Sequence, residues 1–372
     1  MLVLHFCVTL QQIQAMELGI SMFGDNHFDS AGRPLSAAQR LQELVEEIKL
    51  MDEVGLDFFG IGEHHRADYA VSVPEIILAA AAPVTKQIKL GSAVTVLSST
   101  DPVRVYQSFA TVDLLSNGRA EIMAGRGSFI ESYPLFGFDL DDYDALFDEK
   151  LELLLQINQS ERITWKGRFR PALQNQQVLP RALQQQLPVW IAVGGTPESV
   201  VRAARYGLPV MFAIIGGNPA QFKPLVEYYR KAWQHYGNPA TQLQTGVHIH
   251  AFFGANSKAV ADEYFPIYAA QMNRVGSTRG WPPYQRTTYD AGRNKNGHLI
   301  IGDAQEAVDK ILELQATLGL TRFAAHMDVG GPSHAALMKS IEMYGTQIAP
   351  KVREALKQTT TTTTGAGVST ST

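Results

Sequence analysis

Short apolar, β-branched runs alternate with amphipathic stretches of helical period along most of the chain. We predict eight strands, at residues 17–23, 57–62, 89–97, 120–124, 189–193, 210–215, 246–253 and 322–327. Strands that alternate with helices indicate a parallel sheet. The count of eight, with no dinucleotide-type glycine fingerprint after the first strand, favours a (β/α)8 TIM barrel over an open doubly wound sheet.

Local signals for helix starts support this order of elements. Ser36 with Gln39 has the spacing of a capping box. The pairs Asp101-Pro102 and Thr196-Pro197 each read as an N-cap followed by a first-turn proline. These signals define helix boundaries and carry no information about a substrate.

Two connections are longer than a strand-to-helix link needs, so we expect insertions after strands four and seven. Residues 161–180 predict a small hairpin with its turn near Gly167. Residues 276–297 are rich in Gly, Pro, Arg and aromatic residues, among them Trp281, Tyr284 and Arg286. Long loops within a compact domain are usually lids or disordered. We expect a substrate lid here, with a static insertion or a dimer contact as the alternatives.

Charge and composition exclude some classes of function. The net charge of −4 gives no electrostatic footprint for nucleic acid or for an anionic membrane surface. No apolar run reaches the length of a transmembrane helix. Cys7 is the single cysteine, which rules out an internal disulfide and suits a reducing, cytoplasmic setting.

The expected domain organisation has three parts. Residues 1–15 are apolar and contain no Lys or Arg, so we read them as an N-terminal extension before Met16 rather than as a signal peptide. Residues 16–357 form the barrel domain. Residues 358–372 are rich in Thr, Gly and Ser, and we expect a disordered tail.

The second predicted strand ends in Glu63-His64-His65. In a barrel the carboxyl ends of the strands build the active site, and an imidazole suits proton transfer near neutral pH. The alternative for His64 is a buried, hydrogen-bonded core residue. Side chains alternate along a strand, so we expect only one of the two imidazoles to face the barrel mouth. Glu63 either orients an imidazole or pairs with an arginine of a helix.

Several further motifs occur in a particular order. They are Gly-Ser-Ala-Val-Thr-Val-Leu at 91–97, Asp-Pro-Val-Arg at 101–104, Asp-Leu-Leu-Ser-Asn-Gly-Arg at 113–119, Gly-Arg-Gly at 125–127, Phe-Gly at 136–137, and the glycine turn and helix start within 188–199. With residues 60–65, this order and spacing resemble the bacterial luciferase family of flavin-dependent monooxygenases, in particular its uncharacterised luciferase-like branch. The chain departs from luciferase at Gly125, where luciferase has a reactive cysteine, so no thiol acts there.

The resemblance implies a flavin site that holds FMN. It places a non-prolyl cis peptide at Ala93-Val94 under the flavin ring, and Arg126 near the flavin phosphate. The turn Gly194-Gly195 with Thr196 and Ser199 opens a helix whose N-terminus favours an anion. Gly216 and Gly217 follow strand six and would cradle the same phosphate. For Thr196 the alternative is simple N-capping.

The resemblance also implies the reaction. Reduced FMN binds first and reacts with O2 to a peroxyflavin, which oxygenates a small organic substrate such as an aldehyde, with His64 and Glu63 as the catalytic residues. The chain shows no reductase domain, so a separate NAD(P)H:flavin reductase would supply reduced FMN in trans. We expect a homodimer and no metal.

Three alternatives remain open from the sequence. One is a deazaflavin-dependent oxidoreductase of the same fold. Another is a metal-dependent hydrolase, because His248 and His250 share a strand face and, with His64 and the strand end at His326 and Asp328, suggest a metal site. The third is a flavin-binding protein without catalysis.

Overall fold

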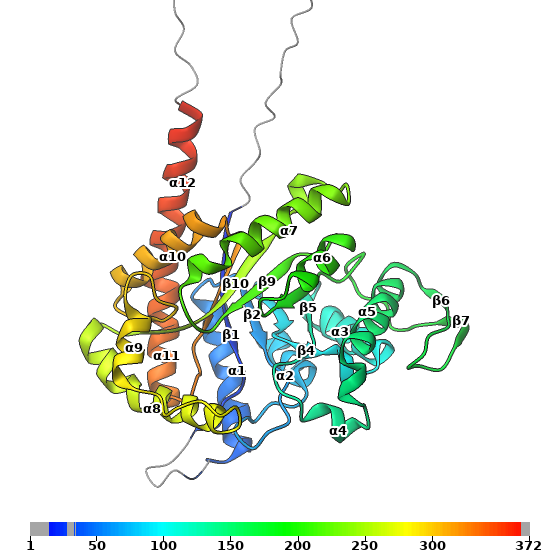
Figure 1. Ribbon diagram of the computed structural model, residues 1–372, viewed down its shortest axis with the longest axis horizontal. Helices are drawn as coiled ribbons and strands as arrows, with labels where there is room; N and C mark the ends of the chain where they lie inside the picture. Colours follow the sequence, from blue (N-terminus) through cyan, green and yellow to red (C-terminus); the bar gives the residue numbers. More distant parts are fainter. Residues whose placement is uncertain (1–14, 28–32, 34, 366–372) are drawn as a thin grey trace, which may run out of the picture.

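Eight parallel strands close into a ring at the centre of the computed structural model, which describes residues 15–27, 33 and 35–365 (Figure 1). The ring runs in chain order through β1 (Glu17–Met22), β2 (Phe58–Ile61), β3 (Lys89–Ser92), β5 (Ala120–Gly125), β8 (Val189–Val193), β9 (Val210–Ile214), β10 (Thr245–Phe253) and β12 (Arg322–His326). Pairing of β12 with both β10 and β1 closes it. The predicted (β/α)8 barrel is therefore confirmed.

The strands match the predicted runs closely, except for the third. The predicted strand 89–97 divides into β3 and a two-residue strand β4 (Thr95–Val96), which pairs with β5. The peptide bond Ala93-Val94 lies between the two pieces and is cis. The predicted third strand is therefore interrupted at this position.

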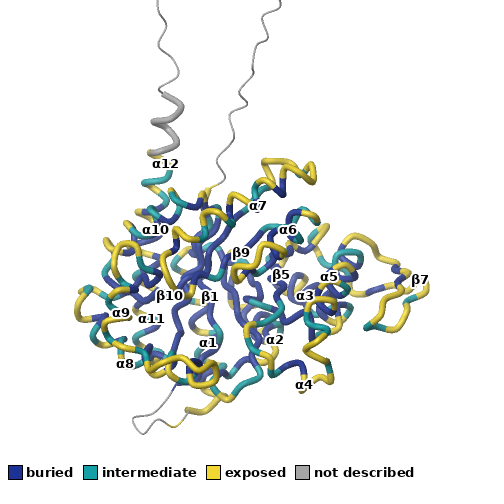
Figure 2. The backbone as a smooth tube through the Cα atoms, in the orientation of Figure 1, coloured by how far each residue is buried: buried dark blue, intermediate teal, exposed yellow. Residues whose placement is uncertain are grey.

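Helices surround the ring, and the buried residues concentrate in the strands that they cover (Figure 2). They are α1 (Ala37–Glu53), α2 (Pro74–Ala81), α3 (Pro102–Ser116), α4 (Ser132–Phe136), α5 (Tyr143–Gln159), α6 (Pro197–Arg205), α7 (Lys223–His235), α8 (Ser257–Ser277), α9 (Arg286–Arg293), α10 (Ala304–Leu318), α11 (His334–Met343) and α12 (Ala349–Gly365). Among the described residues, none of these helices combines the length and apolarity that crossing a bilayer requires.

The predicted caps are only partly formed. Asp101 accepts hydrogen bonds from the backbone N–H groups of Val103 and Arg104, as an N-cap should. Ser36 and Thr196 occupy N-cap positions but make no side-chain capping bond. The Thr196 hydroxyl is therefore available for another partner.

Both predicted insertions are present, and both are more ordered than loops. After the fourth barrel strand, β6 (Arg162–Trp165) and β7 (Leu173–Gln177) form an antiparallel hairpin. Its connection is longer than a tight turn at Gly167 and is held to α5, because Glu149 accepts from the backbone N–H of Arg168 and Phe169. The segment after the seventh strand contains α9, and β11 (Ile300–Gly302) extends the sheet beside β10.

The described residues at the two ends of the chain give little information on the predicted domain organisation. Residues 1–14, including Cys7, lie outside the described residues. Helix α12 continues past Lys357 to Gly365, so its backbone enters the Thr-rich tail, and residues 366–372 lie outside the described part.

The side chain of Arg322 fills the amino-terminal end of the barrel. Arg322 is fully buried, with its guanidinium 4.4 Å from the ring centre of Phe58 and 4.2 Å from that of Trp190. It donates to both carboxylate oxygens of Glu121, at 2.5 and 3.0 Å, and to Glu17 at 2.6 Å. A buried guanidinium is tolerated because its donors are paired. This end of the barrel is therefore filled by side chains.

Candidate active site

A cavity of about 600 Å³ opens at the carboxyl ends of the strands. Its walls are mostly apolar, and they include Phe23 after β1, Val94, Met123 on β5, Met211 on β9 and Val329 after β12. Convergence of strand ends on one chamber is what the barrel topology provides. The predicted residues Glu63, His64, Ala93, Val94, Arg126, Gly194 and Gly216 all line it.

His64 lies in the wall of this cavity with one nitrogen uncommitted. Its Nε2 is buried and has no hydrogen-bond partner among the described residues. Its ring stacks on Tyr69, with the ring centres 4.2 Å apart, and packs against Phe23 at 4.5 Å. Burial, and to a smaller extent the nearby His326, lowers the pKa of His64 to about 3, so the imidazole is neutral at pH 7.

Both histidines of the strand-end motif line the cavity, whereas we expected only one imidazole to face the barrel mouth. Strand β2 ends at Ile61, and the residues that follow are irregular, so side-chain alternation no longer applies. His65 Nε2 lies 2.9 Å from Glu63 Oε1. The other Glu63 oxygen accepts from the backbone N–H of Val96 at 2.8 Å. Glu63 thus orients His65 and holds the chain beyond the cis peptide.

The absence of a side chain at Gly125 has a steric reason. A Cβ at this position would lie 2.8 Å from a methyl carbon of Val94. Val94 and Ala93 form the cavity wall at the cis peptide, and Gly125 allows them to pack against the end of β5. A thiol at position 125 would require this wall to move.

Arg126 reaches the start of α6 at the other end of the cavity. Its Nη2 donates to Ser199 Oγ at 3.2 Å and to Thr196 Oγ1 at 3.4 Å, and the two hydroxyls are 2.7 Å apart. Nη1 pairs with Asp144, and the guanidinium lies 5.0 Å from the ring centre of Tyr143. The predicted residues Arg126, Thr196 and Ser199 are therefore brought together.

The glycines beside this cluster leave open space. A Cβ built at Gly194, Gly195 or Gly216 would meet no atom within 4 Å. Gly195 and Gly217 have φ values of +136° and +74°, which favour glycine. Backbone N–H groups at a helix N-terminus, a guanidinium and two hydroxyls are suitable partners for a phosphate. These residues fit the phosphate of FMN, and the apolar chamber beside them fits a flat ring system.

Three of the histidines that suggested a metal site line the cavity, and two of them bond to each other. His248 Nε2 lies 2.8 Å from His326 Nδ1, and His326 Nε2 lies 3.1 Å from Asp328 Oδ1. His248 Nδ1 lies 2.8 Å from Ser21 Oγ. His248 is engaged in this chain, and the group of described residues whose ligand atoms lie within 4.8 Å of one another consists of Asp25, His326 and Asp328. His250 is separately bonded to the Tyr268 hydroxyl at 2.8 Å.

The chain of hydrogen bonds ends at an acceptor, the carboxylate of Asp328. Asp328 also accepts from the backbone N–H groups of Phe23 and Gly24, at 3.1 and 2.8 Å, so it is an acceptor on both oxygens. His326 Nε2 then donates to Asp328, while Ser21, His248 and His326 Nδ1 continue the chain away from this carboxylate. Burial lowers the pKa of His248 well below its ordinary value, which keeps this histidine neutral.

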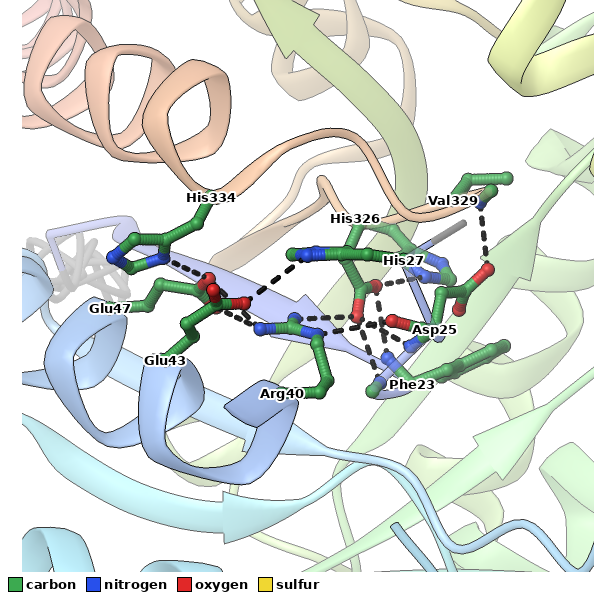
Figure 3. Close-up of polar contacts among 12 residues, drawn as sticks. Phe23, Asp25, His27, Arg40, Glu43, Glu47, His326, Val329 and His334 are labelled. Carbon is green, nitrogen blue, oxygen red and sulfur yellow. Dashed lines mark hydrogen bonds and ion pairs between the residues drawn. The ribbon is translucent and has the colours of Figure 1, made fainter. Parts of the chain in front are cut away.

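Arg40 of α1 forms a buried ion pair with Asp328. Its Nη2 lies 3.5 Å from Asp328 Oδ2, and its Nη1 donates to both oxygens of Glu47 at 2.9 and 3.0 Å. Glu47 in turn bonds to His334 at 2.9 Å. Figure 3 shows Arg40 between Glu47 and His334 on one side and Asp25 and His326 on the other. The carboxyl ends of β1 and β12 are fixed by this buried network.

The predicted lid residues Trp281, Tyr284 and Arg286 do not all lie at the cavity. Trp281 lines the cavity. Tyr284 instead packs against Tyr268, with the ring centres 5.5 Å apart, and Arg286 pairs with Asp262 and Asp290 away from the cavity. Arg279, which the sequence analysis missed, donates to the backbone carbonyl of Ser128 at 2.9 Å.

Contacts across the mouth involve one further residue that the sequence analysis missed. Phe129 follows β5, and the Arg279 guanidinium lies 5.3 Å from its ring centre and 5.4 Å from that of Trp281. Asp25, also missed, lies on the cavity wall after β1. An Asp directly after a predicted strand was a usable signal for Asp25, whereas nothing in the sequence pairs Phe129 with Arg279.

Comparisons with known proteins agree with this architecture. The model of the family described as luciferase-like monooxygenase matches residues 16–321. The uncharacterised protein y4vJ of Sinorhizobium fredii is 25% identical over 86% of this chain and 94% of its own length. The N-acetyl-S-alkylcysteine monooxygenase of Bacillus subtilis is 26% identical over 78% of this chain and 88% of its own. The oxygenase component of the flavin-dependent trigonelline monooxygenase of Acinetobacter baylyi is 23% identical, over 82% and 88%.

Solved structures show the same fold. The monooxygenase RslO1 of Streptomyces bottropensis superposes with a TM-score of 0.78 at 21% identity, covering 90% of this chain and 99% of that one. The oxygenating constituent of the Pseudomonas putida 3,6-diketocamphane monooxygenase, solved with FMN, gives 0.72 at 18%, covering 91% and 99%. The coenzyme F420 dependent tetrahydromethanopterin reductase of Methanopyrus kandleri gives 0.70 at 18%, covering 90% and 99%.

The matched family model spans most of the chain, and the barrel, the cavity and the order of the sequence motifs agree with it. The chain belongs to the family of luciferase-like monooxygenases and is an oxidoreductase.

Proposed function

We propose that the protein binds reduced FMN in this cavity and uses it with O2 to oxygenate a small apolar substrate such as an aldehyde. The observation that carries the proposal is that Arg126 and His64 line one chamber. Arg126 bonds to Thr196 and Ser199 at the start of α6, and His64 has an unpaired nitrogen. When bound, reduced FMN supplies two electrons, with which one atom of O2 enters the substrate and the other becomes water.

The residues of this chain have separate tasks in that proposal. Arg126, Thr196 and Ser199 hold the phosphate, with Gly194, Gly195, Gly216 and Gly217 allowing its approach, and Ala93 and Val94 lie against the flavin ring. His64, neutral at pH 7, offers Nε2 for proton transfer, while Glu63 holds the neighbouring His65. A separate NAD(P)H:flavin reductase would supply the reduced cofactor; the relative named an oxygenase component supports this arrangement.

A deazaflavin is the alternative cofactor, because the fold is shared with a coenzyme F420 dependent enzyme. The phosphate cluster next to a flat apolar chamber supports FMN. The two cofactors differ in whether O2 takes part in the reaction, so they are separable by experiment.

The first prediction concerns the phosphate. In fluorescence titrations the protein should bind FMN more tightly than riboflavin, and Arg126→Met should remove this preference, lowering FMN affinity about 10- to 100-fold because a charge-assisted hydrogen bond is lost. Arg202→Met is the matched control, since Arg202 lies on α6 but pairs with Asp148. Equal affinity of the unmodified protein for FMN and riboflavin would contradict a phosphate site, and tighter binding of coenzyme F420 would favour the deazaflavin.

The second prediction concerns His64. With photoreduced FMN, O2 and a series of aliphatic aldehydes, His64→Ala should retain FMN affinity but form carboxylic acid about 10²–10⁴-fold more slowly, because proton transfer is lost. His235→Ala, at an exposed histidine, is the control. Full activity in His64→Ala would remove His64 from the mechanism. A loss of circular dichroism together with activity would instead support the structural role of a core histidine.

The third prediction concerns the residues at the mouth of the cavity. We propose that Trp281 and Arg279 shield the cavity from water through their contacts with Ser128 and Phe129. Trp281→Ser should leave FMN affinity unchanged and raise the hydrogen peroxide released per reduced FMN several-fold. Arg286→Ser is the control, because Arg286 lies away from the cavity. Deleting residues 276–297 would be uninformative, since Tyr289 within them is fully buried. An unchanged peroxide yield in Trp281→Ser would argue against shielding.

The fourth prediction concerns assembly. We propose a homodimer that covers the exposed apolar side chains of α2 and α3, where Ile76 is 65%, Leu114 47% and Leu115 55% exposed. Light scattering should give twice the chain mass of 40.9 kDa, and Ile76→Glu with Leu115→Glu should give the mass of one chain. Leu140→Glu, at an exposed leucine elsewhere, should leave the mass unchanged. A single-chain mass for the unmodified protein would refute the dimer.

A further inference from the structure

Two buried carboxyl groups, that of Asp25 in the cavity wall and that of Asp328 next to it, lie close together and are not equivalent. Asp25 and Asp328 each have an oxygen within 4.8 Å of the other and of a His326 nitrogen. Asp328 is completely buried, and its oxygens accept from three backbone N–H groups and from His326, with Arg40 at 3.5 Å. So many donors hold Asp328 in its charged form.

Asp25 has far fewer donors. It is 3% exposed, and its Oδ2 accepts one hydrogen bond, from the Gly330 N–H at 2.7 Å. Its Oδ1 has no hydrogen-bond partner among the described residues. A second negative charge beside Asp328 in a buried site is unfavourable, because like charges at short range cannot both be stabilised there. Protonation of Asp25 relieves that repulsion and makes the free oxygen a donor.

The surroundings of Asp25 favour the neutral form. Burial first, and then the Asp328 carboxylate, raise the pKa of Asp25 well above its ordinary value, while the Gly330 N–H and the cations Arg40 and Arg274 oppose the shift. The other titratable groups that face it are His326, Tyr69 and Tyr264. The phenols are neutral at pH 7, since burial raises the pKa of both above their ordinary value.

The free oxygen belongs to a residue of the cavity wall. Asp25 lines the same chamber as His64, and an isolated backbone bridge joins Asp25 to Tyr69, the residue whose ring stacks on His64. The chamber is otherwise mostly apolar, so a ligand there has few polar partners. A pocket of this kind selects apolar molecules that carry an acceptor at the matching position.

We propose that Asp25 is a neutral carboxylic acid in the folded enzyme and that its O–H donates a hydrogen bond to an acceptor oxygen, such as a carbonyl, of an apolar substrate. The inference rests on the proposed function only in identifying the ligand as a substrate. It assigns to the cavity a specificity-determining residue and restricts the substrate class to apolar molecules with an oxygen acceptor. An aldehyde or ketone meets this description, whereas a plain hydrocarbon does not.

Infrared spectroscopy with bound FMN tests the proposal. At pH 7 the protein should show the carbonyl stretch of a protonated carboxyl, absent in Asp25→Asn and kept in Asp309→Asn, which changes an exposed aspartate. The variants are needed because burial also raises the pKa of Glu75. Acetophenone labelled with ¹³C at its carbonyl should shift the Asp25 band to lower frequency. Ethylbenzene, bound to the same protein as checked by saturation-transfer NMR, should not shift it.

The outcomes separate the parts of the account. No band, or a band that persists in Asp25→Asn, overturns the neutral acid. A band that bound acetophenone leaves unshifted overturns the recognition role. Failure of oxygenation in a protein that shows both the band and its shift contradicts the proposed function and leaves the assignment of Asp25 standing.

The pH dependence of unfolding provides a second readout. A raised pKa in the folded state means that folded protein keeps a proton that the unfolded chain releases above pH about 4. The unfolding equilibrium constant of the unmodified protein should therefore rise relative to that of Asp25→Asn as pH increases above this value, by up to about tenfold per pH unit. Asp309→Asn should follow the unmodified protein. If the unfolding equilibrium constant of Asp25→Asn changed with pH in the same way as that of the unmodified protein, the proposal would be overturned.

Discussion

The buried ion pair between Arg40 and Asp328 is the interaction on which the geometry of the site depends. Asp328 follows the last barrel strand, and its carboxylate receives the backbone N–H groups of the residues that follow the first strand. Arg40, from α1, neutralises it from behind and is itself held by Glu47. One charged group thus fixes the seam where the barrel closes. A buried carboxylate is costly unless it is paired in this way.

The charge of Asp328 influences the protonation and the hydrogen bonds of the other polar groups around the cavity. Because Asp328 is an acceptor, His326 donates to it from Nε2, and His248 and Ser21 extend this chain of hydrogen bonds. Burial, together with the negative charge of the neighbouring Asp328, favours the neutral form of Asp25. His64 is neutral for a different reason, since its surroundings are aromatic rings. These titratable groups are therefore neutral or paired, and their hydrogen-bond donors and acceptors are held in place. Such a chamber suits chemistry that must exclude water.

The sequence predicted the barrel well because each strand is an apolar run with clear helix signals between. It also predicted which residues gather at the strand ends, since topology alone brings Glu63, His64, Arg126, Thr196 and Ser199 to one face. It failed where local geometry decides. The alternation rule did not apply to His65 because the strand had already ended, and Arg286 was assigned to a lid although it pairs with acidic neighbours. The pairing of Asp25 with Asp328 joins residues about 300 positions apart, and no local pattern signals it.

The most direct test of the central claim is the fate of molecular oxygen. The protein is mixed with anaerobically photoreduced FMN and an aliphatic aldehyde, and then exposed to oxygen-18 gas, with mass spectrometry of the product. The account predicts one labelled oxygen atom in the carboxylic acid and a label in the water formed. An unlabelled product, or the same product formed without oxygen when an oxidised deazaflavin accepts the hydride and water supplies the oxygen atom, would contradict it.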